Sequence, residues 1–228
     1  MMMNQRIRVI TIGICLIALL MPLYIALAAS LFNQTYLPII NKQPSTPTSQ
    51  PPVLFPNGDF EQGPVIWTQY SSHGWKLIYP QQELPQGVSP YDGSWVAWLG
   101  GDYSETSFIE QQIFVSSFLP YMSYWYWVVP SVSDGCGNSY GLVLVNGEEV
   151  QGYDLCYDTG GWIQGVIDLS NHSNNWVVIQ IIALCINSNS DLFVDHVAFQ
   201  PNQNVANHPI EARATIDANT PWKDILGK

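Results

Sequence analysis

Tyr121-Met122-Ser123-Tyr124-Trp125-Tyr126-Trp127-Val128-Val129 places five aromatic rings in nine residues, between Pro120 and Pro130. A short run of aromatic and β-branched residues bounded by prolines is typical of a β-strand. Side chains alternate along a strand, so Tyr124, Tyr126 and Val128 share one face, and Trp125, Trp127 and Val129 share the other. Neither face is polar, so the strand is either central in a double sheet or has one face open to a ligand.

We expect Trp125 and Trp127 to face the core, because the large area of an indole ring is most useful there. Tyr124 and Tyr126 should then lie outward, where their hydroxyl groups tolerate water. On this interpretation the two tyrosine rings form the surface of the strand that is available to a ligand.

Eight further short apolar runs are separated by Gly, Asn, Asp, Ser and Pro residues: 65–70, 75–79, 95–99, 106–115, 140–145, 162–169, 176–186 and 192–200. None shows a sustained period of 3.6 residues. Eight or nine strands at this spacing predict an all-β sandwich or barrel over residues 57–200. Asn146-Gly147 predicts a hairpin turn, because this dipeptide readily adopts the positive φ angles of a type I′ turn.

The chain of 228 residues has only 11% charged residues and a formal net charge of -11. Residues 57–200 contain fifteen Asp or Glu and a single base, Lys76. Such a surface repels phosphates, which argues against nucleic acid as a partner. It is compatible with neutral ligands, with cations, or simply with solubility.

Residues 1–8 carry Arg6 and Arg8 and no acid, and the nearly unbroken apolar run that follows ends in Ala26-Leu27-Ala28. This is the pattern of a secretory signal peptide. The run is also long enough to span a bilayer, so residues 1–29 are either a cleaved signal or an N-terminal anchor. In both cases the remainder is exported, which predicts a secreted or cell-surface protein that meets a membrane only through this segment if it is uncleaved.

Residues 30–56 read as a linker, because prolines among Ser, Thr and Gln form an extended, semi-rigid spacer and no core. Residues 201–228 lose the strand pattern and are polar, which predicts a tail.

Three cysteines remain once Cys15 is assigned to the signal run: Cys136, Cys156 and Cys185. Cys136 follows the aromatic strand and Cys156 follows the Asn-Gly hairpin, so the two can meet across adjacent strand ends. Export makes a disulfide between them plausible, and it would close a loop of about twenty residues. Cys185 lies in a run that is apolar on both faces, which predicts a buried small hydrophobe.

The sequence displays no catalytic motif. The four histidines, His73, His172, His196 and His208, have no zinc-ligand spacing. No nucleophile elbow or phosphate-binding glycine loop is found. A pair of acids for glycoside hydrolysis would be invisible in sequence, since it depends on a separation in space. With no candidate for nucleophile, base and oxyanion site, we predict that the protein is not an enzyme.

Two acids stand out by context. Glu61 lies in Asn57-Gly58-Asp59-Phe60-Glu61, which opens the first strand, and Asp195 lies in Phe193-Val194-Asp195-His196-Val197 of the last strand. First and last strands commonly pair in a sandwich, so oxygen ligands from both ends of the domain could hold a calcium ion. The alternative is that these are ordinary edge and turn acids.

These opening and closing motifs, together with Trp67, the segment Asp92-Gly93-Ser94-Trp95-Val96-Ala97-Trp98-Leu99-Gly100-Gly101 and the aromatic strand, resemble the galactose-binding-like jelly-roll domains. That group includes carbohydrate-binding modules and the MAM-like accessory domains of secreted bacterial proteins. The resemblance covers residues 57 to about 200 and implies a jelly-roll β-sandwich. In the carbohydrate-binding members an acid of each motif binds a structural calcium ion, and the matching positions are Glu61 and Asp195. The sequence departs from the pattern at His196, where a second Asp is common.

The first functional hypothesis is a non-catalytic exported module that binds glycans, because aromatic faces stack on the apolar face of a sugar ring. The candidate rings are Tyr124 and Tyr126 or Trp125 and Trp127 on the aromatic strand, with Trp75 and Tyr91 on loops. We favour the two tyrosines over the two tryptophans. The alternative is a structural or adhesion module that contacts another envelope protein and binds no sugar.

Overall fold

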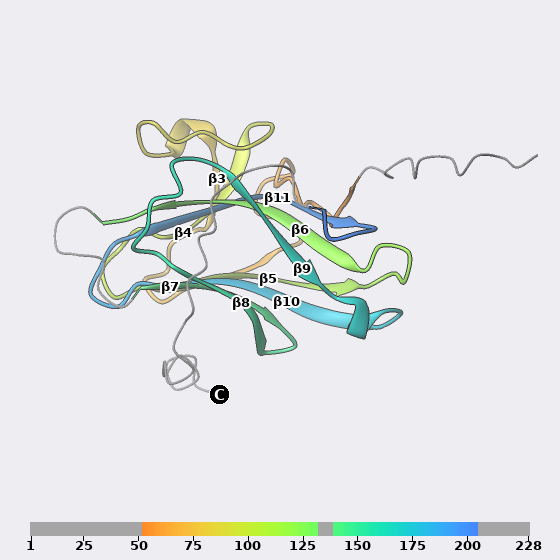
Figure 1. The fold of residues 1–228 in the computed structure, drawn as a ribbon. Helices are drawn as coiled ribbons and strands as arrows, with labels where there is room; N and C mark the ends of the chain where they lie inside the picture. Colours follow the sequence, from red (N-terminus) through yellow and green to blue (C-terminus); the bar gives the residue numbers. More distant parts are fainter. Residues whose placement is uncertain (1–51, 132–138, 205–228) are drawn as a thin grey trace, which may run out of the picture. The chain divides into compact units, whose positions relative to one another are not determined.

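The computed structural model describes residues 52–131 and 139–204, which form two antiparallel sheets (Figure 1). Sheet A contains β3, β4, β11, β6 and β9 in that order, and β1 pairs with β11. Its strands are β1 (Val53–Leu54), β3 (Ile78–Pro80), β4 (Trp95–Gly100), β6 (Tyr121–Val129), β9 (Ile163–Asp168) and β11 (Asp191–Gln200).

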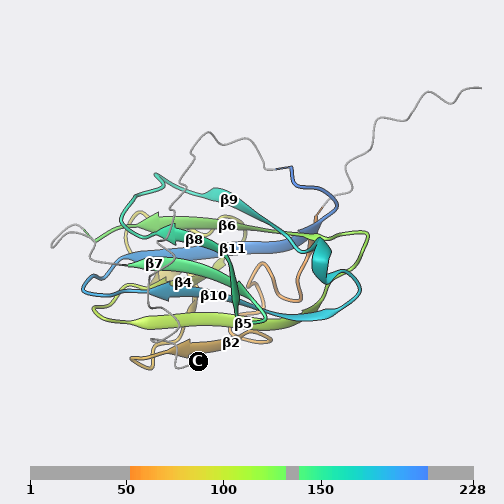
Figure 2. The same cartoon turned by 60° about the horizontal axis from the view of Figure 1, so that its bottom comes forward.

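Sheet B contains β2, β5, β10, β7 and β8 in that order, with β2 at one edge (Figure 2). Its strands are β2 (Thr68–Ser71), β5 (Thr106–Phe114), β7 (Tyr140–Val145), β8 (Glu148–Asp154) and β10 (Trp176–Leu184). Short 3₁₀ helices occur at Gln81–Glu83 and Ser170–His172. From β4 onward successive strands cross between the sheets, apart from the β7–β8 hairpin, which is jelly-roll connectivity.

The predicted all-β sandwich is confirmed, and the nine predicted runs each correspond to a strand. The Asn146-Gly147 turn is confirmed by φ angles of 53° and 84°, and β8 is its second arm. One strand lies in the predicted linker, since Val53–Leu54 pairs with β11 and Phe55 is buried in the core. The apolar Val53-Leu54-Phe55 thus belongs to the sandwich, despite the prolines around it.

The prediction for the two faces of β6 is wrong. Tyr124, Tyr126 and Val128 point into the core between the sheets, with at most 6% of each side chain exposed. The Tyr124 hydroxyl lies 2.6 Å from the Tyr153 hydroxyl, and the Tyr126 ring stacks on the Tyr153 ring at 4.6 Å. A tyrosine can be buried without contact to water when its hydroxyl group forms a hydrogen bond with another buried hydroxyl group.

Two glycines make room for these rings. A Cβ atom on Gly165 would lie 2.5 Å from Cζ of Tyr124, and one on Gly141 would lie 2.3 Å from Cδ2 of Tyr153. Burial raises the pKa of Tyr126 to about 12 and that of Tyr124 further, so both remain neutral. Trp125 and Trp127 therefore occupy the outer face of sheet A.

Cys185 is buried as predicted, and its Sγ donates to the carbonyl oxygen of Ser190 at 3.2 Å. Cys136 lies outside the described residues, so its predicted disulfide with Cys156 stays a prediction. The signal or anchor segment, residues 30–51 of the linker and the tail from residue 205 also lie outside them. In the part of the chain that is described, no helix is long and apolar enough to cross a membrane.

Candidate functional site

A pocket of about 290 Å³ opens beside β3 and β4, where the outer face of sheet A meets the loops that flank these strands. Its lining combines three aromatic rings with one carboxylate, one amine, a leucine and two glycines: Trp75, Lys76, Leu77, Tyr79, Trp98, Gly100, Gly101 and Asp102.

β4 supplies the Trp98 wall of the pocket. Ala97 and Leu99 are buried in the core on either side of Trp98, so strand alternation directs the indole outward. The Tyr79 ring packs against it with 5.3 Å between the centroids. Asp191 on the neighbouring strand accepts a hydrogen bond from Nε1 of Trp98 at 2.7 Å, which fixes the ring. Burial raises the pKa of Asp191 to about 6.

Gly100 and Gly101 line the pocket next to Trp98. Their φ angles are 72° and 82°, in the left-handed region that favours glycine. A Cβ atom on Gly101 would lie 2.7 Å from Oδ1 of Asp191 and 2.9 Å from Nε1 of Trp98. The chain can therefore turn out of β4 close to Trp98 only because both positions are glycine.

Trp75 also lines the pocket and is 57% exposed. Its Nε1 donates to Oδ2 of Asp102 at 3.2 Å, and Nδ1 of His73 lies 3.0 Å from the same oxygen. The backbone N–H of Tyr103 donates to the other oxygen of Asp102 at 2.7 Å. This backbone hydrogen bond, followed by those from His73 and Trp75, lowers the pKa of Asp102. Asp102 is thus an ionised acceptor that orients the exposed indole.

Lys76 is the single Lys or Arg in residues 52–131 and 139–204. Its amino group pairs with Glu83 and lies 4.6 Å from the centroid of the Tyr79 ring. A cation over an aromatic face is held there by the negative charge density of the ring. The pocket therefore presents an acceptor at Asp102 and a donor at Lys76 beside its aromatic walls.

A second aromatic cluster lies over β6. The Tyr91 ring, 39% exposed, stacks on Trp125 with 4.0 Å between centroids and 14° between planes. Trp162 and His196 contact Tyr91 edge-on at 6.2 and 5.7 Å. Nε1 of Trp162 donates to the carbonyl oxygen of Ser89, which ties the Tyr91 loop to the segment before β9.

Of the four predicted ligand-binding residues, Trp75 and Tyr91 lie on the surface, in separate clusters. Tyr124 and Tyr126 lie in the core, and no ligand can stack on them without opening the sandwich. Tyr79, Trp98, Lys76 and Asp102 also line the pocket and were not among the predicted residues. Alternation between Ala97 and Leu99, together with the Gly100-Gly101 pair, was the signal that could have identified Trp98.

Glu61 and Asp195, the two predicted calcium ligands, contact one loop from the two ends of the domain. Oε1 of Glu61 accepts the N–H groups of Ser94 and Trp95 at 2.7 and 2.8 Å. Oδ2 of Asp195 accepts those of Tyr91 and Asp92 at 2.9 and 3.2 Å. The two carboxylates therefore clamp residues 91–95.

Burial rather than a basic partner controls the protonation state of Asp195. Asp195 is fully buried, and burial raises its pKa to about 8, with the Glu61 charge adding to the rise. The one described Lys or Arg, Lys76, is paired with Glu83 instead. With a pKa of about 8, Asp195 is mostly protonated at pH 7, and a bound cation would stabilise its ionised form. Within the described residues, however, no three His, Cys, Asp or Glu side chains gather as a metal-binding group. Any metal would need further ligands, such as backbone carbonyl groups.

No family model and no curated protein matches the chain. Similar solved structures include a carbohydrate-binding module, TmCBM61, in complex with β-1,4-galactotriose. It is 14% identical, the match covers 66% of this chain and 99% of the module, and the TM-score is 0.48.

Two further similar structures have other functions. The K2 cleaved adhesin domain of Lys-gingipain is 14% identical, with 62% and 95% of the two chains covered and a TM-score of 0.44. A Stig cyclase, FisC from Fischerella sp. TAU, is 11% identical, with 65% and 96% covered and a TM-score of 0.44. At this level of similarity the matches decide no function, and related sandwiches serve unlike chemistries, so function must be argued from the site.

Proposed function

We propose that the protein is a non-catalytic, exported module that binds a glycan in the pocket formed by Trp75, Tyr79 and Trp98. The observation that carries the proposal is the combination in one pocket of three aromatic rings with the Asp102 carboxylate and the Lys76 amine. Aromatic faces take up the apolar C–H face of a sugar, while an acceptor and a donor at the rim hydrogen-bond its hydroxyl groups.

The charge distribution supports a neutral sugar. With fifteen acids and one base in residues 57–200, the domain would repel an acidic polysaccharide. Lys76 does not offset this, because Glu83 already neutralises it. The ligand class is therefore a neutral glycan.

The state of the pocket carboxylate supports binding without catalysis. Glycoside hydrolysis uses two acids, one of which must be protonated to protonate the leaving group. Among the described residues that line the pocket, Asp102 is the one acid, and its hydrogen bonds lower its pKa. An ionised, well-anchored carboxylate suits a hydrogen-bond acceptor.

The same proposal includes a bound calcium ion with a structural role. Glu61 and Asp195 would hold it, and its charge would stabilise the two acids that clamp residues 91–95. Export through the N-terminal segment, cleaved or retained, would place the module in the secreted fraction or on the cell surface. No contact in the described residues favours an envelope protein over a sugar as the partner.

The proposal is tested by affinity electrophoresis and calorimetry against soluble neutral polysaccharides, with β-1,4-galactan, xyloglucan and mixed-linkage β-glucan as probes. We expect the wild-type protein to bind at least one probe and Trp75→Ala to bind it at least tenfold more weakly, because the most exposed wall of the pocket is removed. Folding should be unaffected, since Trp75 is largely outside the core.

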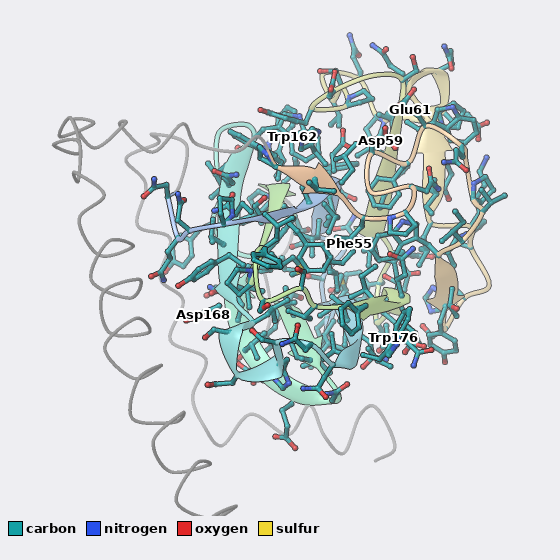
Figure 3. The ribbon with its side chains drawn as sticks, turned by 90° about the vertical axis from the view of Figure 1, so that its right-hand side faces the viewer. Phe55, Asp59, Glu61, Trp162, Asp168 and Trp176 are labelled. Carbon is teal, nitrogen blue, oxygen red and sulfur yellow. The ribbon has the colours of Figure 1, made fainter. Side chains whose placement is uncertain are left out.

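Trp176→Ala is the matched control. Its indole is 63% exposed, but it lies on sheet B and packs against Phe114 with 5.7 Å between ring centroids. Figure 3 shows that it is well separated from Trp162 of the aromatic cluster over β6. This variant should bind like the wild type. Equal binding by Trp75→Ala and the wild type, or no binding to any probe, would contradict the proposed function.

A further inference from the structure

The outer face of sheet A carries a row of aromatic rings that leads away from the pocket. Trp98 on β4 pairs in register with Phe193 on β11, and Phe193 pairs in register with Trp127 on β6. Their centroids are 5.6 and 6.4 Å apart in that order. The three rings therefore lie side by side across neighbouring strands, at right angles to the strand direction.

The row continues beyond both tryptophans. At the pocket end, the Tyr79 ring on β3 follows Trp98. At the other end, Trp162 lies 6.0 Å from Trp127, and Tyr91 lies 6.2 Å from Trp162. The row therefore runs from Tyr79 at the pocket to Trp162, and Tyr91 joins it from the side, because its ring stacks on Trp125 of the same strand as Trp127.

The spacing of the partly exposed rings is the informative quantity. Phe193 is fully buried, whereas Trp98, Trp127 and Trp162 are half-buried. Neighbouring strands lie about 4.8 Å apart, so the backbones of Trp98 and Trp127, two strands apart, are separated by about 10 Å. The ring spacings of 5.6 and 6.4 Å through Phe193 are compatible with a similar distance between the two indole rings. This separation is close to the repeat of every second sugar in an extended, equatorially linked chain, whose rings present flat apolar faces.

From this row we propose that the module binds an extended, neutral, β-linked polysaccharide that crosses sheet A, with one end in the pocket and further sugars stacked on Trp98 and Trp127, the partly exposed rings on either side of the buried Phe193. This inference rests on the proposed function, since it assigns the ligand class and adds a subsite at Trp127. A pocket alone would hold one or two sugars. A row of rings across three strands gains affinity from each further sugar that stacks on it.

The test measures affinity against chain length, with β-1,4-linked manno-, xylo- and cello-oligosaccharides of two to six sugars as probes in calorimetry. For the series that binds, we expect the hexasaccharide to bind at least tenfold more tightly than the disaccharide. In Trp127→Ala this gain should shrink to less than threefold, with disaccharide affinity unchanged. Trp75→Ala should weaken every length alike, and Trp176→Ala should match the wild type.

Trp127→Phe covers the case in which the alanine variant does not fold, because it keeps a ring against Phe193 and reduces only the stacking face. Its length-dependent gain should lie between those of the wild type and the alanine variant. Affinity that stops rising after two sugars, or a gain that survives in both Trp127 variants, would overturn the extended-chain inference and leave the pocket function intact. If no oligosaccharide and no polysaccharide binds, the proposed function itself fails.

Discussion

Asp191 shows how a single residue can serve both the fold and the pocket. Its Oδ1 accepts the Trp98 indole N–H, and the close approach of Gly101 keeps the carboxyl group covered. Burial is the largest cause of its raised pKa of about 6, and the hydrogen bond from Trp98 opposes that rise. The residue therefore fixes the pocket wall while it destabilises the fold whenever it is ionised.

We predict a pH-dependent stability difference between the wild type and Asp191→Asn. The pKa of Asp191 is about 6 in the folded state and about 3.9 in the unfolded state. The contribution of Asp191 to folding stability is therefore most favourable below pH 4, where the carboxyl group is protonated in both states, and it is lost as the pH rises through 6. Asparagine keeps the acceptor without the charge. The free energy of unfolding of the variant, relative to the wild type, should rise by roughly 1 to 3 kcal/mol between pH 4 and 7 in urea titrations.

Asp168→Asn is the control, and its stability difference from the wild type should stay nearly constant between pH 4 and 7. Asp168 is exposed, and hydrogen bonds from Ser170 lower its pKa. Its contribution is therefore present above the unfolded pKa and is lost as the pH falls through the folded one. A stability difference for Asp191→Asn that is constant from pH 4 to 7 would contradict the assignment of the raised pKa to burial.

At the scale of the element, β6 depends on space provided by its neighbours. Its inward tyrosines fit because Gly165 on β9 faces Tyr124 and Gly141 on β7 faces Tyr153. The hydroxyl pair of Tyr124 and Tyr153 then bridges the two sheets. A tyrosine can therefore occupy a core position when its partner strand and the opposite sheet both accommodate it.

We predict that Gly165→Ala lowers the free energy of unfolding by about 1 to 3 kcal/mol, because the new Cβ atom overpacks the site against the Tyr124 ring. The cost should be clearly smaller when the same change is made in a Tyr124→Leu background, where the end of the ring is absent. Urea unfolding of the four proteins measures this coupling. An equal cost in both backgrounds would show that the Tyr124 ring is not the source of the strain.

At the scale of the whole molecule, the strand pairing that closes the sandwich also brings two acidic side chains close together. The opening segment pairs with β11 through Phe55 and Val197, and the Asp195 carboxylate lies in the same part of that strand. Glu61 from the opening motif and Asp195 from the closing motif then hold the same loop. Closing the domain thus brings two acids together, which favours either protonation of Asp195 or binding of a cation.

We predict that calcium raises the melting temperature of the wild-type protein relative to EDTA by roughly 5 to 10 °C at a calcium concentration about 100-fold above its Kd. Glu61→Gln should lose this rise, although glutamine can still accept the N–H groups of Ser94 and Trp95. Differential scanning calorimetry checks both. The same melting temperature in calcium and EDTA would mean that Glu61 and Asp195 act only as a clamp for the loop.

The alternation of apolar and turn residues determined the sandwich, because strand formation depends on local pattern and turn chemistry. The Asn146-Gly147 hairpin and the buried Cys185 were predictable in this way, whereas the loop that Glu61 and Asp195 both contact was not. Strand β1 was hidden by prolines, since Val53-Leu54-Phe55 pairs only through its tertiary partner β11.

Which face of β6 is buried was decided by the tertiary structure alone. The sequence placed the tyrosines opposite the tryptophans but could not show that Gly165, Gly141 and Tyr153 would meet them across the sheets. The pocket has the same origin, because Trp75, Trp98 and Asp102 come from separate segments. Composition and periodicity are local properties of the chain, whereas a core face and a binding surface depend on which distant strands become neighbours.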